Sequence, residues 1–215
     1  MLRNMVLTLQ ILAALVLISP SEMSQQGASE KPLYVELKPA LPTQTGDKIE
    51  VVEVFWYGCP HCYSFEPFLE NWEKTLPADV QLIRVPGVLS QNWIPLGKAY
   101  YTAEKLGVLD KTHRPLFDAI HKDRKISQVP DEESLKEFFV SKGVAADQFS
   151  QTFASKEVEA KIRQAYFLAR DYKLTGVPSL VINGKYLTST TQTGSFEAMI
   201  SVLNQLIEKE RQARK

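Results

Sequence analysis

The hydrophobic positions of the chain follow two kinds of spacing, which predict strands in some segments and helices in others. The run "KIEVVEVFWY" from Lys48 to Tyr57 is rich in β-branched and aromatic residues, as is typical of a strand covered on both faces. Residues 79–88 form a second such run, and the alternating segment "LYVEL" at 33–37 predicts a short strand. Apolar residues recur at helical spacing between the two long runs: Phe65, Phe68, Leu69, Trp72 and Leu76. We expect the two long strands to be parallel, because a helix connects them.

The pattern is helical from Trp93 to Lys173. Gly107 follows one amphipathic segment, and Thr112 is the candidate N-cap of a second. Asp131 is the candidate N-cap of a third segment, which stops at Gly143. Two further helices are predicted, over residues 145–153 and 155–174.

Strand signals return after this helical block. The segments "VPSLVI" and "KYLTS" flank the dipeptide Asn183-Gly184, which predicts a β-hairpin with a type I′ turn. An amphipathic helix is predicted over residues 195–214. The element order therefore predicts an α/β fold with one sheet, interrupted by an all-helical insertion. We expect the sheet-bearing part to comprise residues 33–90 and 174–215, and the insertion residues 91–173.

Composition leaves the binding partner open. The 215 residues suit one sizeable core, and 25 acidic residues balance 25 basic ones. No long-range field therefore favours nucleic acid or another strongly charged partner.

The N-terminus has the layout of a secretory signal peptide. Arg3 precedes an uncharged, mostly apolar run from Met5 to Ile18, which is shorter than the roughly 20 residues of a membrane-spanning helix. We expect a signal peptide over residues 1–23, with ends at residue 21 or 28 as alternatives because no clear cleavage triplet is present. An uncleaved signal that anchors the protein to the membrane is the alternative.

Both cysteines of the chain lie in the stretch "CPHC", Cys59 to Cys62. The pair could be a structural disulfide, part of a metal site, or a reactive dithiol. A structural disulfide is disfavoured because a loop this small constrains the unfolded chain very little. A metal site would need further ligands, and His113 and His121 lie far along the chain with no matching spacing. No metal ligand is assigned, and a metal-binding module remains the alternative from a different class.

The position of Cys59, where a strand ends and a helix begins, favours redox chemistry. Free N–H groups and the helix dipole at a helix N-terminus stabilise a thiolate, so Cys59 is the candidate nucleophile. Cys62, on the first helical turn, is within disulfide reach and can resolve a mixed disulfide. His61 is a candidate stabiliser of the Cys59 thiolate, and Pro60 stiffens the loop and supplies no N–H.

Cys-Pro-His-Cys after an aromatic strand, followed by "YSFEP", a helical block and "TGVPSLVINGKY", resembles the DsbA family of bacterial periplasmic thiol-disulfide oxidoreductases. The resemblance covers the chain from about Tyr34 onward. It implies a thioredoxin-like fold with an inserted helical domain. It also implies that Val177-Pro178 is a cis-proline dipeptide, which packs against the active site and offers backbone groups of Val177 to an extended substrate.

Glu53 is a charged residue inside the apolar strand that leads to Cys59. Burial would raise the pKa of this carboxyl, so Glu53 is a candidate relay for the proton exchanged with Cys62, and it matches a buried glutamate of the family. An ion pair with Arg84 on the neighbouring strand is the alternative. The family often has lysine near that position, and arginine does not deprotonate. Both roles remain open.

Several aromatic residues lie near the cysteines or in the helical block. Trp56 and Tyr57 could form an apolar rim for unfolded chains, although we expect at least one of them to lie in the core. Trp93, His113 and His121 are assigned no functional role, because helix packing and solvent exposure account for them.

The resemblance implies a dithiol oxidase in the periplasm of a Gram-negative bacterium. Such an enzyme passes its Cys59–Cys62 disulfide to reduced, unfolded exported proteins and is reoxidised by a membrane quinone reductase of the DsbB type. It needs no cofactor, and we expect a monomer. An isomerase or reductase of the same fold is the nearest alternative. Known periplasmic isomerases carry an N-terminal dimerisation domain, and only a short linker precedes the first predicted strand here.

Overall fold

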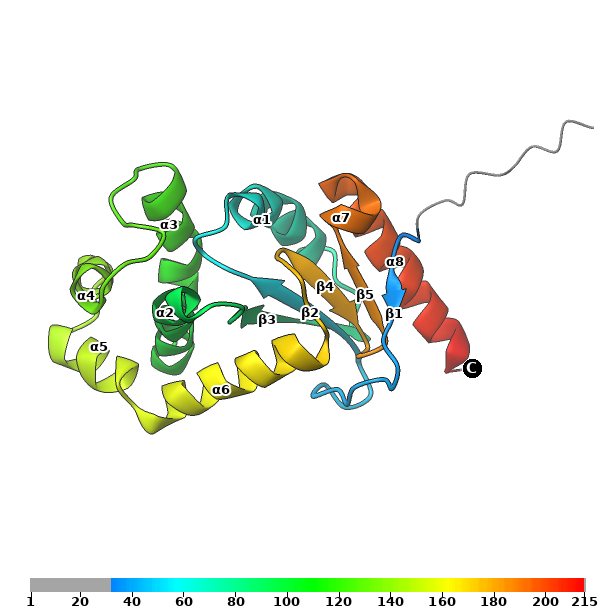
Figure 1. The fold of residues 1–215 in the computed structure, drawn as a ribbon, viewed down its shortest axis with the longest axis horizontal. Helices are drawn as coiled ribbons and strands as arrows, with labels where there is room; N and C mark the ends of the chain where they lie inside the picture. Colours follow the sequence, from blue (N-terminus) through cyan, green and yellow to red (C-terminus); the bar gives the residue numbers. More distant parts are fainter. Residues whose placement is uncertain (1–31, 215) are drawn as a thin grey trace, which may run out of the picture. The chain divides into compact units, whose positions relative to one another are not determined.

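A five-stranded mixed sheet forms the centre of the fold (Figure 1). The computed structural model describes residues 32–214, so the predicted signal peptide of residues 1–23 lies outside the described residues. The strands are β1 (Val35–Glu36), β2 (Ile49–Phe55), β3 (Val80–Pro86), β4 (Ser179–Ile182) and β5 (Tyr186–Ser189), in the spatial order β1-β5-β4-β2-β3. Strand β2 pairs in parallel with β3 and antiparallel with β4. The predicted parallel pairing of the two long strands is confirmed.

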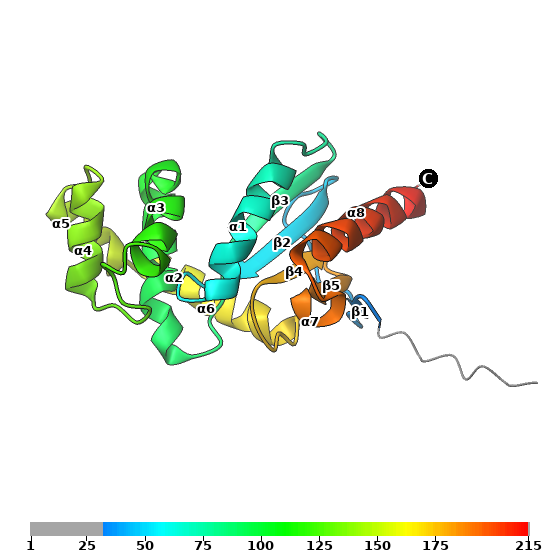
Figure 2. The same cartoon turned by 90° about the horizontal axis from the view of Figure 1, so that it is seen from above.

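The helices fall into two groups. Helices α1 (Pro60–Glu73) and α8 (Phe196–Ala213) contact each other and pack on the sheet. A second group lies between β3 and β4 in the chain, and most of it gathers beyond one end of the sheet (Figure 2). It comprises the 3₁₀ helix η1 (Gln91–Trp93), α2 (Ile94–Leu106), α3 (Leu109–His121), α4 (Glu132–Ser141), α5 (Ala146–Phe153) and α6 (Lys156–Asp171). The α/β fold with an all-helical insertion is therefore confirmed.

Strand β2 is buried on both of its faces, as its mostly apolar, β-branched run predicts. Ile49 and Val51 belong to the cluster formed with α1 and α8, whereas Val52 and Val54 belong to the cluster formed with the inserted helices. Side chains alternate between the two faces of a strand, so each face of β2 meets a different helical group. This arrangement places the end of β2 at the junction of the two groups.

Local capping residues set several of the helix ends. Asp131 accepts a hydrogen bond from the backbone N–H of Ser134, which confirms its predicted role as N-cap of α4. Gly107 ends α2 in the left-handed conformation, with φ of 66°. The prediction for Thr112 was wrong, because α3 already begins at Leu109. The hydroxyl of Thr112 donates to the carbonyl of Val108 from within the helix.

The predicted hairpin is present. Asn183 and Gly184 both have positive φ, 50° and 63°, which is the type I′ turn that joins β4 to β5. A side chain at Gly184 would collide with the carbonyl of Leu41. The short helix α7 (Thr190–Thr193) was not predicted, since "TTQT" has no apolar spacing. None of the described helices is long and apolar enough to cross a membrane.

Candidate active site

Cys59 is the N-cap of α1, and Pro60 is the first residue of the helix. The backbone of Cys59 is extended, with φ of −87° and ψ of 118°, and its N–H donates to the carbonyl of Trp56. The two cysteines are unbridged, and both side chains are buried. Gly58 is required here, because any side chain at this position would collide with the ring of Trp56. The chain thus turns from β2 into α1 with Cys59 at the point where the helix N–H groups are free.

The environment of Cys59 favours its thiolate. A hydrogen bond from the thiol of Cys62 lowers the pKa of Cys59 most, and burial opposes this effect. Hydrogen bonds from the backbone N–H groups of Cys62 and His61, and the charge of His61, lower the pKa further, to about 6. The helix N-terminus and His61 therefore act on Cys59 in the predicted direction. The largest contribution, from Cys62, was not predicted.

Cys62 has the opposite character. Its side chain is fully buried on the first turn of α1, and burial raises the pKa of its thiol well above the usual value. The hydrogen bond with Cys59, and the charges of Cys59 and Glu53, raise the pKa further. Cys62 is therefore the cysteine that holds a proton when both are reduced.

The loop before β4 faces Cys59. The peptide bond between Val177 and Pro178 is cis, as the resemblance implies. The sulfur of Cys59 lies 3.6 Å from the carbonyl oxygen of Val177. Cys59, Pro60 and Val177 together line a cavity of about 400 Å³ beside the cysteine pair.

Two tryptophans form another wall of that cavity. Trp56 stacks on Trp93 of η1, with ring centroids 4.4 Å apart and ring planes at 3° to each other. Trp56 is half-buried, whereas Tyr57 is only 1% exposed. The expectation that at least one of Trp56 and Tyr57 lies in the core is met by Tyr57. Trp93, to which the sequence assigns no role, lies at the site because η1 follows directly on the loop after β3.

Glu53 is buried on β2, directly opposite Arg84 of β3. The Nε atom of Arg84 lies 3.3 Å from Oε2 of Glu53, while its two Nη atoms hold the carboxylate of Glu73 at 3.1 and 2.7 Å. Burial raises the pKa of Glu53 well above the usual value, and the charge of Glu66 raises it further, while Arg84 lowers it. The ion pair with Arg84 is therefore present, and the pKa of Glu53 is raised as its burial predicts.

A second buried carboxylate near the cysteines was missed from the sequence. Glu66 lies on α1 with no exposed surface, and its Oε1 is 3.3 Å from Nε2 of His113. Nδ1 of His113 is 2.7 Å from the hydroxyl of Tyr57, and Nε2 of His121 is 2.7 Å from the carbonyl of Tyr57. The helical stripe in which Glu66 lies, beside Phe65, could have revealed its burial.

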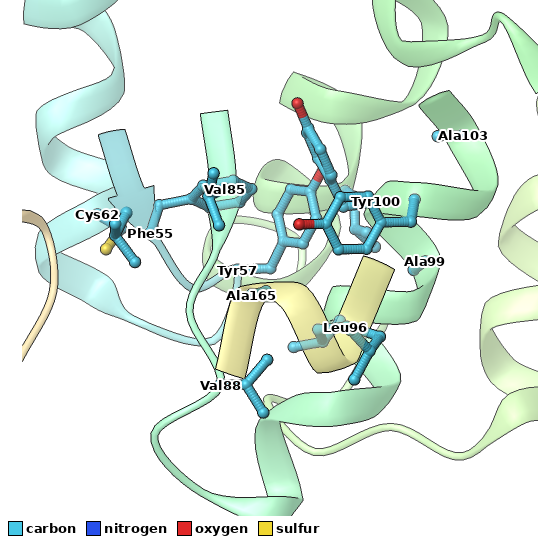
Figure 3. Packing of buried hydrophobic residues seen from close by; sticks show 14 of the residues in the cluster. Phe55, Tyr57, Cys62, Val85, Val88, Leu96, Ala99, Tyr100, Ala103 and Ala165 are labelled. Atoms are coloured by element: carbon cyan, nitrogen blue, oxygen red, sulfur yellow. The ribbon is translucent and has the colours of Figure 1, made fainter. Parts of the chain in front are cut away.

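Both histidines of α3 thus pack against the residue that leads into the cysteine loop. The side chain of His113 is 14% exposed and His121 is half-buried, so solvent exposure does not account for them. Figure 3 shows the buried cluster in which Phe55 and Tyr57 meet Tyr100 of α2, with Cys62 at its edge. The inserted helices therefore complete the packing behind the cysteine pair. Within residues 32–214, no group of three or more His, Cys, Asp or Glu side chains is placed to hold a metal ion.

Comparisons with known proteins agree with this geometry. The family model for the DSBA-like thioredoxin domain matches residues 83–200. The thiol:disulfide interchange protein DsbA of Pseudomonas syringae pv. tomato is 41% identical over 219 residues, which cover 100% of this chain and 99% of the relative. The DsbA of Azotobacter vinelandii is 43% identical over 180 residues, 84% of this chain and 83% of the relative.

Solved structures are similar as well. The crystal structure of Pseudomonas aeruginosa DsbA has a TM-score of 0.80 and 40% sequence identity, and it covers 85% of this chain and 94% of its own. The crystal structure of the oxidoreductase DsbA from Xylella fastidiosa has a TM-score of 0.78 and 34% identity, with 83% and 95% covered.

Proposed function

The chain belongs to the DsbA family of disulfide oxidoreductases with a thioredoxin-like fold, and we propose from this premise that it is a periplasmic dithiol oxidase. It donates a disulfide between Cys59 and Cys62 to reduced, unfolded proteins that have been newly exported. The observation that carries the proposal is the contrast between the two thiols. Cys59 has a pKa of about 6, whereas burial raises the pKa of Cys62.

The reaction proceeds in two displacement steps. A substrate thiolate attacks the sulfur of Cys59, the Cys59–Cys62 bond breaks, and its electron pair goes to Cys62, which takes up a proton. Glu53, buried beside Cys62, supplies that proton. A second substrate thiolate then attacks the substrate sulfur of the mixed disulfide, and Cys59 leaves as a thiolate. The substrate loses two electrons and gains a disulfide, and the cysteine pair is reduced.

The other predicted site residues support these steps. His61 and the helix N-terminus stabilise Cys59 as the leaving group, which makes the disulfide more oxidising. Pro60 stiffens the loop between the cysteines. The loop at Val177 and Pro178 binds the substrate as an extended strand beside Cys59, because backbone groups can pair with any sequence.

The remaining parts of the proposal concern the cellular setting. Residues 1–23 act as a signal peptide, and the mature protein is a monomer that needs no cofactor. Residues 33–90 and 174–215 form the thioredoxin-like domain, and residues 91–173 form the helical insertion domain. A membrane quinone reductase of the DsbB type restores the disulfide by accepting the two electrons.

The test is the redox equilibrium of the cysteine pair with glutathione. An oxidase should equilibrate near the strongly oxidising value of about −120 mV, whereas a reductase would lie near about −270 mV. An isomerase would lie between them, near about −180 mV. The Cys59→Ser variant should lose all oxidation of a reduced, unfolded substrate. Retention of activity in this variant, or a strongly reducing potential, would overturn the proposal.

A further inference from the structure

The buried charges behind Cys62 do not balance in pairs. The positive charge of Arg84 acts on both buried carboxyls, Glu53 and Glu66. Both Nη atoms of its guanidinium already donate to Glu73. Nε of Arg84 faces Glu53, and the contact between this nitrogen and Oε2 of Glu53 does not meet hydrogen-bond geometry. Two buried carboxylates cannot both ionise at low cost under these conditions.

Most carboxyl oxygens of Glu53 and Glu66 lack a hydrogen-bond partner. Both oxygens of Glu53 and Oε2 of Glu66 are buried without a hydrogen-bond partner among residues 32–214. Buried polar atoms in native proteins nearly always form hydrogen bonds, so three carboxyl oxygens without a partner in one place are unusual. Each of them can hold a proton, and a protonated carboxyl has a lower desolvation cost than an ionised one.

A hydrogen-bond chain ends on the fourth oxygen and decides which carboxyl is ionised. The hydroxyl of Tyr57 lies 2.7 Å from Nδ1 of His113, and Nε2 of His113 lies 3.3 Å from Oε1 of Glu66. Burial raises the pKa of Tyr57 well above its usual value, so this hydroxyl keeps its proton and can donate to Nδ1. Nδ1 of His113 can accept from this hydroxyl or donate to it, and in both arrangements the Nε2–H can point to Glu66.

The electrostatics of the two carboxyls agree with this chain. Burial acts to raise the pKa of Glu66, but the hydrogen bond and charge of His113, with the charges of Arg84 and Arg114, lower it overall. The pKa of Glu53 is raised by burial first and then by the negative charge of Glu66. An ionised Glu66 therefore favours a protonated Glu53.

The cluster is drawn from α1, α2, α3, β3 and the segment after β2, whereas β4, which pairs with β2 at Glu53, contributes no charged group. Its titratable and charged members are Cys62, Glu66 and Glu73 on α1, Arg84 on β3, Tyr57 after β2, Tyr100 on α2, and His113 and Arg114 on α3. Of these, only His113 donates a hydrogen bond to Glu66 in the described part of the chain. His113, Arg84 and Glu73 also line a surface cavity of about 300 Å³, where the cluster meets solvent.

We infer that His113 is a positioning residue for the disulfide exchange, which holds Glu66 ionised so that Glu53 keeps the proton destined for Cys62. This inference rests on the proposed function, because it assigns the control of a proton that the oxidase reaction consumes. When the Cys59–Cys62 bond breaks, the proton passes from Glu53 to the sulfur of Cys62 and Glu53 becomes a carboxylate. The helical insertion, through α3, thereby acts on the chemistry of the thioredoxin-like part.

The test measures the rate of oxidation of one reduced, unfolded substrate between pH 5 and pH 9 by the full-length oxidised protein. Glu66→Gln keeps the side-chain shape and removes the negative charge, so the pKa of Glu53 should fall. The ratio of variant to wild-type rate cancels the ionisation of the substrate thiol. This ratio should stay near one in acid and fall about tenfold or more in base. The reason is that the alkaline limb of the pH–rate profile, where the rate declines as Glu53 loses its proton, moves down by about 1 pH unit.

Variants of His113 separate positioning from packing. His113→Phe should move the alkaline limb in the same direction as Glu66→Gln, because the proton shifts from Glu53 to Glu66 when the donor is lost. His113→Gln should restore much of the wild-type profile, since its amide can donate to Glu66. His121→Gln is the matched control on the same helix and should leave the limb in place, because His121 contacts the carbonyl of Tyr57 instead.

A second readout does not depend on turnover. Carbon-13 chemical shifts of the glutamate carboxyl groups should show Glu53 protonated above its usual range in the wild type and ionised at lower pH in His113→Phe. If wild-type protein oxidises the substrate but neither the limb nor the Glu53 titration moves in these variants, the inference is wrong and the proposed function stands. If wild-type protein does not oxidise the substrate, the proposed function fails, whereas the Glu53 titration still decides the electrostatic coupling.

Discussion

The sulfur of Cys59 lies 3.6 Å from the carbonyl oxygen of Val177, although 118 positions separate the two residues in the chain. The contact joins the N-terminus of α1 to the loop before β4, and the two strands β2 and β4 bring these segments together by pairing antiparallel. A substrate strand bound to the backbone of Val177 would therefore present its sulfur to Cys59.

The acidity of Cys59 should depend on Cys62. We expect reduced protein to be alkylated by iodoacetamide at Cys59 with a midpoint near the pKa of about 6. Cys62→Ala should raise this midpoint, because the thiol of Cys62 is the strongest single stabiliser of the thiolate. Cys62→Ser keeps a donor and should raise it less. A wild-type midpoint near the free-cysteine value of about 8.5 would contradict this assignment.

The same pKa makes the stability of the reduced protein depend on pH. An acid whose pKa is lowered on folding contributes stability that is complete above the unfolded pKa and is lost as pH falls through the folded pKa. For Cys59, with a folded pKa of about 6, this contribution should grow by about 1.4 kcal/mol between pH 5 and pH 7. The oxidised protein has no Cys59 thiol and should not show it.

Urea unfolding of both redox forms at a series of pH values measures this difference directly. Subtracting the oxidised curve from the reduced curve removes every titration that the two forms share. The raised pKa of Cys62 acts in the opposite sense, but only above the ordinary thiol pKa, so it lies outside this window. A difference that is flat from pH 5 to pH 7 would show that Cys59 is not ionised in the folded protein.

Glu53 should be needed for rapid exchange. Glu53→Gln removes the proton that Cys62 requires, so we expect the rate of substrate oxidation at pH 7 to fall by about one to two orders of magnitude. Glu50→Gln is the matched control, because Glu50 is also buried on β2 but accepts a hydrogen bond from the backbone of Gln44. Stopped-flow fluorescence can follow both variants. Equal rates for wild type and Glu53→Gln across pH would contradict the role of Glu53 as proton relay and leave it a structural role in the ion pair with Arg84.

The sequence predicts the fold where a local signal decides the structure. The apolar run of β2, the cap at Asp131 and the turn at Asn183-Gly184 each act over a few residues, and all three are present as expected. The prediction for Thr112 was wrong because α3 begins at Leu109, almost directly after Gly107. Thr112 therefore lies inside the first turn of the helix and not at its N-cap.

The residues of the site also divide into those that a local signal predicts and those that depend on tertiary packing. The position of Cys59 at a helix N-terminus can be predicted from adjacent residues. The hydrogen-bond chain from Tyr57 through His113 to Glu66 depends instead on how α3 packs against α1. The pattern of a single helix indicates which face is buried, but not which polar group of another helix meets that face. The pairing of Glu66 with His113 therefore could be recognised only from the tertiary structure.

The stacked tryptophans should matter for protein substrates more than for small ones. Trp56 forms a wall of the cavity beside Cys59 and is supported by Trp93, so Trp56→Ala removes apolar surface that a bound polypeptide would cover. Loss of one aromatic contact of this kind costs about 1–3 kcal/mol, so KM for a reduced, unfolded protein should rise about 5- to 150-fold. Oxidation of dithiothreitol, which is too small to span the cavity, should change much less.

Trp72→Phe is the control for this prediction. Trp72 lies on α1 but donates a hydrogen bond to Asn204 of α8, away from the cysteine cavity, so its loss should affect stability and leave KM unchanged. Equal losses with the protein substrate and dithiothreitol in Trp56→Ala would mean that Trp56 acts on the thiol chemistry. A selective loss with the protein substrate would mean that the cavity between Trp56 and Val177 is where the polypeptide binds.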